Sequence, residues 1–146
     1  MTWKLKTFDS LTLYELYAIL RLRTEVFVVE QTCVFQDMDN KDQHCYHLMG
    51  WRDDLLIAYT RLVPPDIFYK EPSIGRVVTS PAARGNGIGK LLMKKSIEEV
   101  FHLYGKTPIK LGAQLYLKKF YESLGFIQTS GIYDEDGINH IEMMRQ

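Results

Sequence analysis

The amino-acid sequence predicts a single domain of the mixed α/β class, built on one mixed sheet with covering helices. The chain has 146 residues, a length that suits one domain burying roughly two-thirds of its unfolded surface. Short segments rich in β-branched residues alternate with longer segments of helical periodicity. Because no repeat, linker or low-complexity tract interrupts them, we expect residues 1–146 to form one domain.

The first half of the chain predicts a strand, a helix and a β-hairpin. Residues 3–8 alternate between apolar and polar, as a half-buried strand does, and Asp9 or Ser10 can cap the following helix. The apolar residues expected on the buried side of that helix are Leu13, Leu16, Tyr17, Leu20 and Phe27. Residues 45–51 and 55–63 predict two strands joined by a turn at 52–54, and two prolines end the hairpin.

The second half predicts strands at 74–79, 108–113, 126–133 and 138–144, with a turn at 134–137. A long amphipathic helix is expected from residue 88 to about residue 104, where Gly105 ends it, and a short one over 116–124, ended by Gly125. The predicted order is therefore strand, helix, three strands, helix, strand, helix and two strands.

The loop before the long helix is the clearest candidate binding site. Its residues are Arg84, Gly85, Asn86, Gly87, Ile88 and Gly89, followed by Lys90. The glycines let an anion approach the main chain, and the first N–H groups of a helix lack partners within it. The loop therefore predicts a pyrophosphate site. The dinucleotide pattern G-x-G-x-x-G and the P-loop pattern both fail here, which disfavours nucleotide chemistry.

The same loop matches R/Q-x-x-G-x-G/A and resembles the acyl-coenzyme A motif of the GNAT superfamily of N-acyltransferases. Residues 120–126, FYESLGF, resemble the family's Y-x-x-x-G-F helix end. The runs RTEVFVVEQTCVFQDMDNKD, GRVV, RGNGIGKLL and YDEDGINHIEM together resemble the ElaA-like branch. The resemblance extends from about Leu20 to Met144 and implies the GNAT fold, whose strand and helix order agrees with the predicted one.

This resemblance implies an enzyme that transfers an acyl group from acetyl-CoA to a primary amine by direct attack in a ternary complex. It implies that the main chain of Arg76, Val77, Val78 and Thr79 binds the pantetheine arm, with the N–H of Val78 directed by a bulge at the thioester oxygen. Gln114 stands where many relatives carry asparagine at the cofactor. Tyr121 is at the position of the general acid, and a phenol with a pKa of about 10 can protonate a departing thiolate.

The general base is open among Glu30, His47, His140 and water. For each side chain, a structural hydrogen bond or simple exposure is the competing interpretation. Cys33 and Cys45 are weak alternatives as acyl-carrying nucleophiles, because neither lies in a recognisable Cys/His arrangement.

The acidic run QDMDNKD is expected to be a solvated loop, with a rim that attracts an amine as the alternative. It fails the calcium-loop pattern, because Lys41 would occupy a ligand position. His44, Cys45 and His47 lack the further ligands of a zinc site. We therefore expect no metal.

Composition restricts the partners. Eighteen basic and eighteen acidic side chains give no net charge, which disfavours nucleic acid or an anionic membrane as partner. Two cysteines and no apolar leader or spanning segment predict a cytoplasmic protein, either a monomer or a homodimer. The resemblance implies that the acceptor is a small-molecule or peptide amine, whose identity the sequence leaves open. Two other interpretations stay open: a sensor that binds acyl-CoA without turnover, and a nucleotide-binding protein that uses the same loop.

Overall fold

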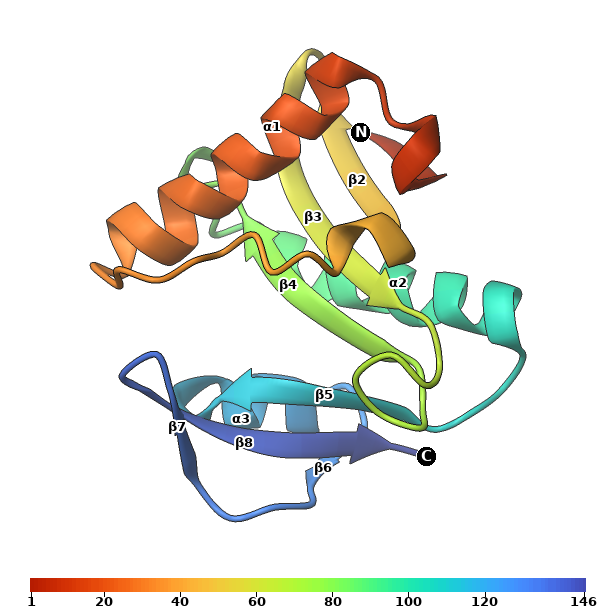
Figure 1. Cartoon of the computed structure of the whole chain (residues 1–146), viewed down its shortest axis with the longest axis vertical. Helices are drawn as coiled ribbons and strands as arrows, with labels where there is room; N and C mark the ends of the chain where they lie inside the picture. The colour runs from red at the N-terminus through yellow and green to blue at the C-terminus, as the bar shows by residue number, and fades with distance from the viewer.

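The computed structural model describes residues 1–146, which form an eight-stranded mixed sheet with helices on both faces (Figure 1). The strands are β1 (Thr2–Thr7), β2 (Tyr46–Arg52), β3 (Leu55–Val63), β4 (Ser73–Thr79), β5 (Ile109–Gln114), β6 (Phe126–Gln128), β7 (Tyr133–Glu135) and β8 (Ile138–Arg145). The helices are α1 (Leu13–Arg23), α2 (Ile88–Tyr104) and α3 (Lys118–Glu122). None of them is both long and apolar enough to cross a membrane. The predicted mixed α/β class is confirmed.

The sheet is divided into two halves at the junction of β4 and β5. Its strand order is β1-β2-β3-β4-β5-β8-β6, with β7 paired to β8 beside this path. The central strands β4 and β5 are parallel, yet a single residue pair, Ser73 with Lys110, joins them near their starts. Figure 1 shows the two strands diverging beyond this point. The divergence opens the middle of the sheet toward the carboxyl ends of β4 and β5.

The helices cover opposite faces of the sheet. Alternating residues of a strand point to opposite faces, and Met49 packs with α1 whereas its neighbour Leu48 packs with α2. Tyr121 and Leu124, in and after α3, join the core cluster that holds Met93 of α2. The α2 and α3 helices therefore share one face, and α1 lies on the other.

The predicted buried side of the first helix is wrong at Leu13 and Tyr17, whereas Phe27 packs against the core beneath the helix as expected. Leu13 and Tyr17 are 83% and 74% exposed, and the buried residues are Glu15, Ile19, Leu22 and Arg23. Apolar residues occur all around this helix, and an arginine on the buried side is not expected from hydrophobic periodicity. The cap also differs: Thr12 forms a capping box with Glu15, with hydrogen bonds of 2.9 and 3.0 Å. A π-helical segment, Thr24–Glu30, continues α1.

Most boundaries that depend on local signals agree with the structure. The hairpin of β2 and β3 and the extent of α2 are as predicted, with Gly105 at φ +78° after α2. The strand predicted over 126–133 is two strands instead, β6 and β7, which pair with opposite ends of β8. Between them the chain leaves the regular ladder, and the Ser130 hydroxyl accepts the Glu142 N–H at 2.8 Å. The turn that follows is shorter than predicted, because Asp134 and Glu135 belong to β7.

Candidate active site

The gap between β4 and β5 is the mouth of a cleft of about 1040 Å³. It is lined from both halves of the sheet, by the β4 strand and the π-helical segment on one side and by β5, α3 and the β7–β8 hairpin on the other. Among the predicted site residues that line it are Glu30, Arg76, Val77, Val78, Thr79, Arg84, Gly89, Gln114, Tyr121 and His140. The structure therefore brings together most of the residues that the sequence analysis selected.

The glycine loop has the backbone expected of an anion site. Gly85 and Gly87 adopt φ values of +96° and +70°, and Gly87 is the N-cap of α2 without any side-chain cap. A Cβ built on either glycine would meet nothing within 4 Å, so the main chain is open to an approaching group. Unlike at these two, a Cβ built on Gly89 would lie 3.8 Å from the ring of Phe120. The uncapped N–H groups of the first turn remain available to an anion.

Arg84 forms an ion pair with Glu30. The guanidinium makes two 2.7 Å contacts with the Glu30 carboxylate and donates to the carbonyl of Thr79 at 3.2 Å. The hydrogen bonds from Arg84 lower the pKa of Glu30 below its ordinary value, against the opposing effect of burial. A carboxylate with a lowered pKa accepts protons poorly, so this pairing disfavours Glu30 as the general base.

The expected bulge in β4 is present, and it occurs at Arg76 and Val77. The register of β3 and β4 shifts between Tyr59 and Arg61, and neither Arg76 nor Val77 has a partner in β3. Arg76 adopts a φ of +49°, which is uncommon for a residue with a side chain. Its guanidinium forms an ion pair with Asp37 and donates to the Asp37 carbonyl, both at 2.8 Å. These contacts hold the bulge in its strained conformation.

The pairing also identifies which N–H groups face the gap. Ser80 donates to the carbonyl of Ile57 at 2.8 Å, and Tyr59 lies opposite Val78. Since hydrogen-bonded and non-hydrogen-bonded pairs alternate in an antiparallel ladder, the N–H of Val78 is directed at β3. The predicted oxyanion role of the Val78 N–H is therefore corrected. Arg76 and Val77, which have no register partner in β3, remain the candidates for this role.

Tyr121 enters the cleft from the face of α2 and α3. It is 5% exposed, and its ring packs edge-on against Phe120 and Phe126, with centroids 5.1 and 6.0 Å apart. Burial, followed by the nearby Tyr116, raises the pKa of Tyr121 well above its ordinary value. The hydroxyl consequently stays protonated at neutral pH, as a general acid requires.

His140 and Gln114 lie on the opposite face. These residues are direct partners in the antiparallel pair of β5 and β8, while the next residues, Ala113 and Ile141, belong to the core beneath α3. The Nδ1–H of His140 donates to the Ile138 carbonyl at 2.8 Å, and Nε2 lies 3.3 Å from the Glu135 carboxylate. The cleft thus opens on both faces of the sheet, with Tyr121 at one side and His140 at the other.

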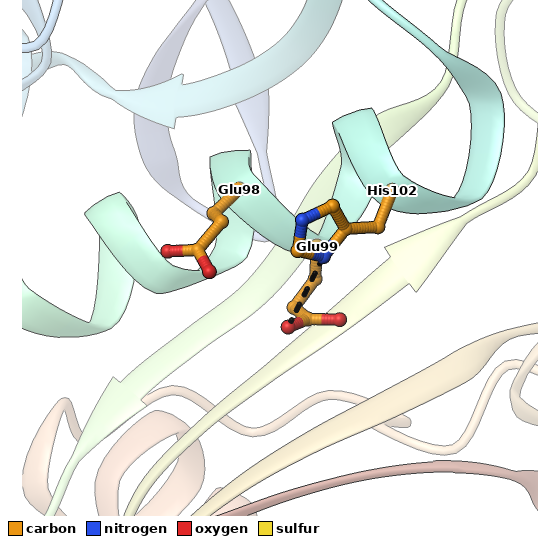
Figure 2. Close-up of side chains that lie close together, drawn as sticks. All are labelled: Glu98, Glu99 and His102. Carbon is orange, nitrogen blue, oxygen red and sulfur yellow. Dashed lines mark ion pairs between the residues drawn. The ribbon is translucent and has the colours of Figure 1, made fainter.

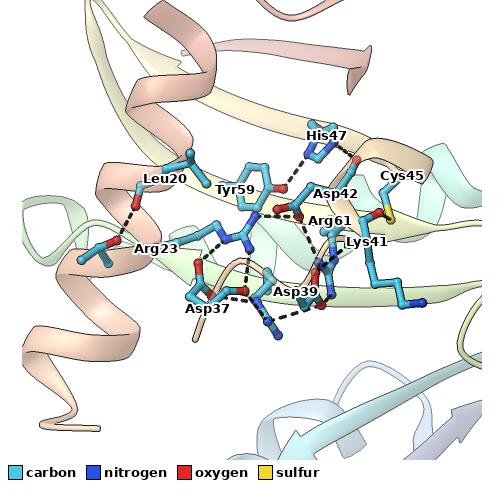
Figure 3. A network of polar contacts seen from close by, with 12 residues as sticks. Leu20, Arg23, Asp37, Asp39, Lys41, Asp42, Cys45, His47, Tyr59 and Arg61 are labelled. Carbon is cyan, nitrogen blue, oxygen red and sulfur yellow. Dashed lines mark hydrogen bonds and ion pairs between the residues drawn. The ribbon is translucent and has the colours of Figure 1, made fainter. Parts of the chain in front are cut away.

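The acidic run is a buried ion-pair network rather than the expected solvated loop (Figure 3). Arg23, 0% exposed, contacts Asp37 and Asp42 at 2.8 Å each, and Arg61 contacts Asp39 and Asp42 at 2.8 and 3.0 Å. Arginines from α1 and β3 compensate the carboxylate charges, and this attraction offsets the cost of removing the carboxylates from water. The prediction failed because those partners lie 14 to 22 residues away in the sequence.

The network predicts loss of stability in acid. Burial alone would raise the pKa of Asp39, but hydrogen bonds and charge from Arg61 outweigh it and lower the pKa to about 2. A carboxyl with a lower pKa in the folded state stabilises the fold above its unfolded pKa of about 4, and this stabilisation disappears as the pH falls toward 2. We expect the melting temperature to fall over this window. Asp39→Asn should flatten the fall, whereas the exposed Asp54→Asn should leave it unchanged; equal curves for all three proteins would contradict the prediction.

The remaining histidine and cysteine candidates make hydrogen bonds within the fold. His47 is 1% exposed and does not line the cleft; its Nε2–H donates to the Asp42 carbonyl at 2.9 Å, and its Nδ1 accepts from Tyr59 at 2.7 Å. Burial raises the pKa of the Cys45 thiol to about 11. Cys33 lines the cleft, but its thiol donates to the Asp136 carbonyl at 3.1 Å. Both cysteines are free thiols.

One group of side chains outside the cleft has metal-ligand atoms close together. Figure 2 shows Glu98, Glu99 and His102 on α2, with ligand atoms within 4.8 Å of one another. Lys95 forms ion pairs with both glutamates at 3.6 and 3.3 Å, so its ammonium group already offsets part of their charge. The prediction that the protein binds no metal stays a prediction.

The diverging strands, the β4 bulge and the glycine-capped α2 helix define a class of protein, the GNAT acyltransferase fold. Residues 17–146 match the family model of the acetyltransferase (GNAT) domain, and the chain belongs to this family. It is ElaA-like, as predicted: it is 43% identical to protein ElaA of Escherichia coli K12 over 146 residues, which cover 99% of this chain and 95% of that protein.

Two solved structures are similar over nearly their whole length. A crystal structure of an acyl-CoA N-acyltransferase from Pseudomonas aeruginosa is 45% identical, with a TM-score of 0.94 and full coverage of both chains. The crystal structure of E. coli ElaA is 42% identical, with a TM-score of 0.92 and 99% coverage of each chain. A UPF0039 protein of Synechocystis is 39% identical over 145 residues, 99% of this chain and 94% of that protein.

Proposed function

We propose that the protein is an acyl-CoA-dependent N-acyltransferase that transfers an acetyl group from acetyl-CoA to a primary amine by direct attack. The observation that carries the proposal is the cleft itself, whose lining includes Arg84 and Gly89 near the N-terminus of α2, the β4 strand with its bulge and the buried Tyr121. Family membership supports the acyl donor, because the family uses acyl-CoA.

The donor would lie on the face of α2 and α3. The pyrophosphate fits the N–H groups of Ile88, Gly89 and Lys90, in the first turn of α2. From there the pantetheine arm would run along the open edge of β4, where the main chain between Arg76 and Thr79 faces the gap. The thioester carbonyl would then lie at the bulge, and its developing negative charge would be stabilised by a main-chain N–H group of Arg76 or Val77.

Tyr121 is the proposed general acid. The amine attacks the thioester carbon, the tetrahedral intermediate collapses, and the thiolate leaves while taking the tyrosine proton. Burial raises the pKa of Tyr121, but the thiolate leaves into the same desolvated surroundings, which also raise its affinity for a proton. Of the side chains proposed as base, His140 is the one that lines the cleft without an arginine partner; water in the cleft is the alternative.

The proposed donor is tested by thermal shift with acetyl-CoA and ATP. At a ligand concentration a hundredfold above the dissociation constant, acetyl-CoA should stabilise the protein by about 2.7 kcal/mol. Release of free thiol from acetyl-CoA with a broad amine panel then tests turnover. Binding without thiol release for any amine would favour a sensor module, and stabilisation by ATP alone would refute the proposal.

Gly87→Ala should weaken acetyl-CoA binding about tenfold, because the added Cβ enters the approach to the main chain while the φ of +70° becomes strained. Gly105→Ala is a matched control, since Gly105 also has a positive φ and an open surrounding but lies at the other end of α2, away from the proposed pyrophosphate site. Calorimetric titration measures both affinities. Stability should fall in both variants, and equal losses of affinity would contradict the proposed site.

A further inference from the structure

The charges that line the cleft are balanced except at one place. Arg84 is paired with Glu30, and Arg61 and Arg76 are paired with aspartates of the buried network. The acidic residues left over are Glu135 and Asp136, at the tip of the β7–β8 hairpin. No lysine or arginine forms an ion pair with either, and the partner of Glu135 is His140. The mouth on the face away from Tyr121 therefore carries negative charge that no lysine or arginine compensates.

Polar groups at this mouth offer acceptors to a cationic ligand. The Nδ1–H of His140 is used by the Ile138 carbonyl, and its Nε2 lies 3.3 Å from the Glu135 carboxylate. The Oε1 atom of Gln114, the register partner of His140, is buried and has no donor. An unpaired buried acceptor is unfavourable until a ligand supplies the missing donor. The Glu135 carboxylate and the Gln114 Oε1 atom are acceptors that suit the N–H donors of an ammonium group.

Aromatic rings complete the mouth. Tyr133 stacks on the His140 ring, with centroids 5.9 Å apart. The hydroxyls of Tyr133 and Tyr69 both approach Gly112, whose missing side chain leaves them room, at 3.0 and 3.7 Å from a Cβ built there. Burial and then Tyr133, Glu142 and Glu135 raise the pKa of Tyr69 to about 12, in keeping with the negative charge nearby. Rings of this kind bind methylene chains and attract cations.

We propose that the acceptor is a short linear diamine, whose non-reacting ammonium group is bound by Glu135, His140 and Gln114. The reacting amine would extend along the aromatic rings into the gap, toward the β4 bulge. His140 is then a ligand of the cation, and water in the cleft takes the proton from the reacting amine. The inference rests on the proposed N-acyltransferase function and adds the class of its acceptor.

The test compares three acceptors with the same carbon chain: 1,4-diaminobutane, butylamine and 4-aminobutanoate. Release of free thiol from acetyl-CoA gives kcat and KM for each. We expect kcat/KM for the diamine to exceed that for butylamine about tenfold, because one charge-assisted contact is gained, and 4-aminobutanoate to be the poorest acceptor. A wild-type protein that uses butylamine or 4-aminobutanoate as well as the diamine would overturn the inference.

Variants then separate the binding of the cation from other roles. Glu135→Gln should raise the KM of the diamine about tenfold and leave butylamine unchanged, and the side chain is 57% exposed, so the fold should tolerate the change. Asp54→Asn removes the same charge from the exposed turn after β2 and should alter neither acceptor. His140→Gln should act on the diamine through KM. An equal fall in kcat for both amines in this variant would make His140 a base and overturn its proposed role.

Failure of the inference and failure of the proposed function give different results. If acetyl-CoA stabilises the protein and another amine is acetylated while none of the three is, the acceptor class is wrong and the N-acyltransferase proposal stands. If acetyl-CoA neither binds nor releases thiol with any amine, both are wrong.

Discussion

Replacing Tyr121 with phenylalanine is expected to lower turnover by about a hundredfold, with little change in the affinity for acetyl-CoA. The ring would keep its edge-on contacts with Phe120 and Phe126, so the packing of α3 on the sheet should survive. What is lost is the hydroxyl proton that the departing thiolate takes in the proposed mechanism. Because the thiolate forms only as the intermediate collapses, the effect belongs in kcat, which steady-state thiol release measures.

Tyr116→Phe is the matched control for this experiment. Tyr116 also lines the cleft, but it is 72% exposed, so its hydroxyl is already solvated. We expect this variant to retain turnover near that of the unchanged protein. A Tyr121→Phe variant with full turnover would move the general acid elsewhere, and equal losses in both variants would indicate a general effect on the cleft wall.

The parts of the fold that the sequence predicts are those with local causes. The turn between β2 and β3, the glycine before α2 and the glycine after it each act over a few residues. The same holds for the candidate site, because the glycine loop and Tyr121 each lie in a short motif. These features were therefore predictable without knowledge of which strands meet.

The parts that failed depend on contacts between distant segments. Arg23 is buried because the chain folds back and places Asp37 and Asp42 in contact with its guanidinium. Hydrophobic periodicity in the sequence does not reveal such ion-pair partners. The run of aspartates was visible in the sequence, but its partners on α1 and β3 were not. The direction of the Val78 N–H likewise depends on one residue of register between β3 and β4.

The sequence also predicted only part of the proposed acceptor-binding mouth of the cleft. His140 and Gln114 were selected from the sequence, but Glu135, Tyr133 and Tyr69 were not. A signal for Glu135 existed in the acidic turn YDEDG, which places carboxylates beside a histidine in the returning strand. Tyr69 had no such signal, since the loop between β3 and β4 reaches the cleft only through the folded sheet.

Replacing Arg23 with methionine is expected to destabilise the protein by about 3–5 kcal/mol, a large part of the total stability of a typical domain. Methionine fills a similar volume, so the main effect is electrostatic. Asp37 and Asp42, which are 7% and 6% exposed, would lose an arginine that contacts each of them at 2.8 Å. Arg61 and Arg76 would compensate only part of the remaining charge. Urea unfolding gives the change in free energy.

Arg21→Met is the control that separates burial from charge. Arg21 lies two residues earlier on α1 and forms a 3.5 Å pair with Glu25, but its side chain is 64% exposed. Removing such a surface pair costs about 0.5 kcal/mol. Since Asp37 also holds Arg76 in the bulge of β4, Arg23→Met should loosen the acetyl-CoA strand as well, and acetyl-CoA affinity should fall with stability. A loss below about 1 kcal/mol for Arg23→Met would show that the network is weak and that the bulge is held by the sheet alone.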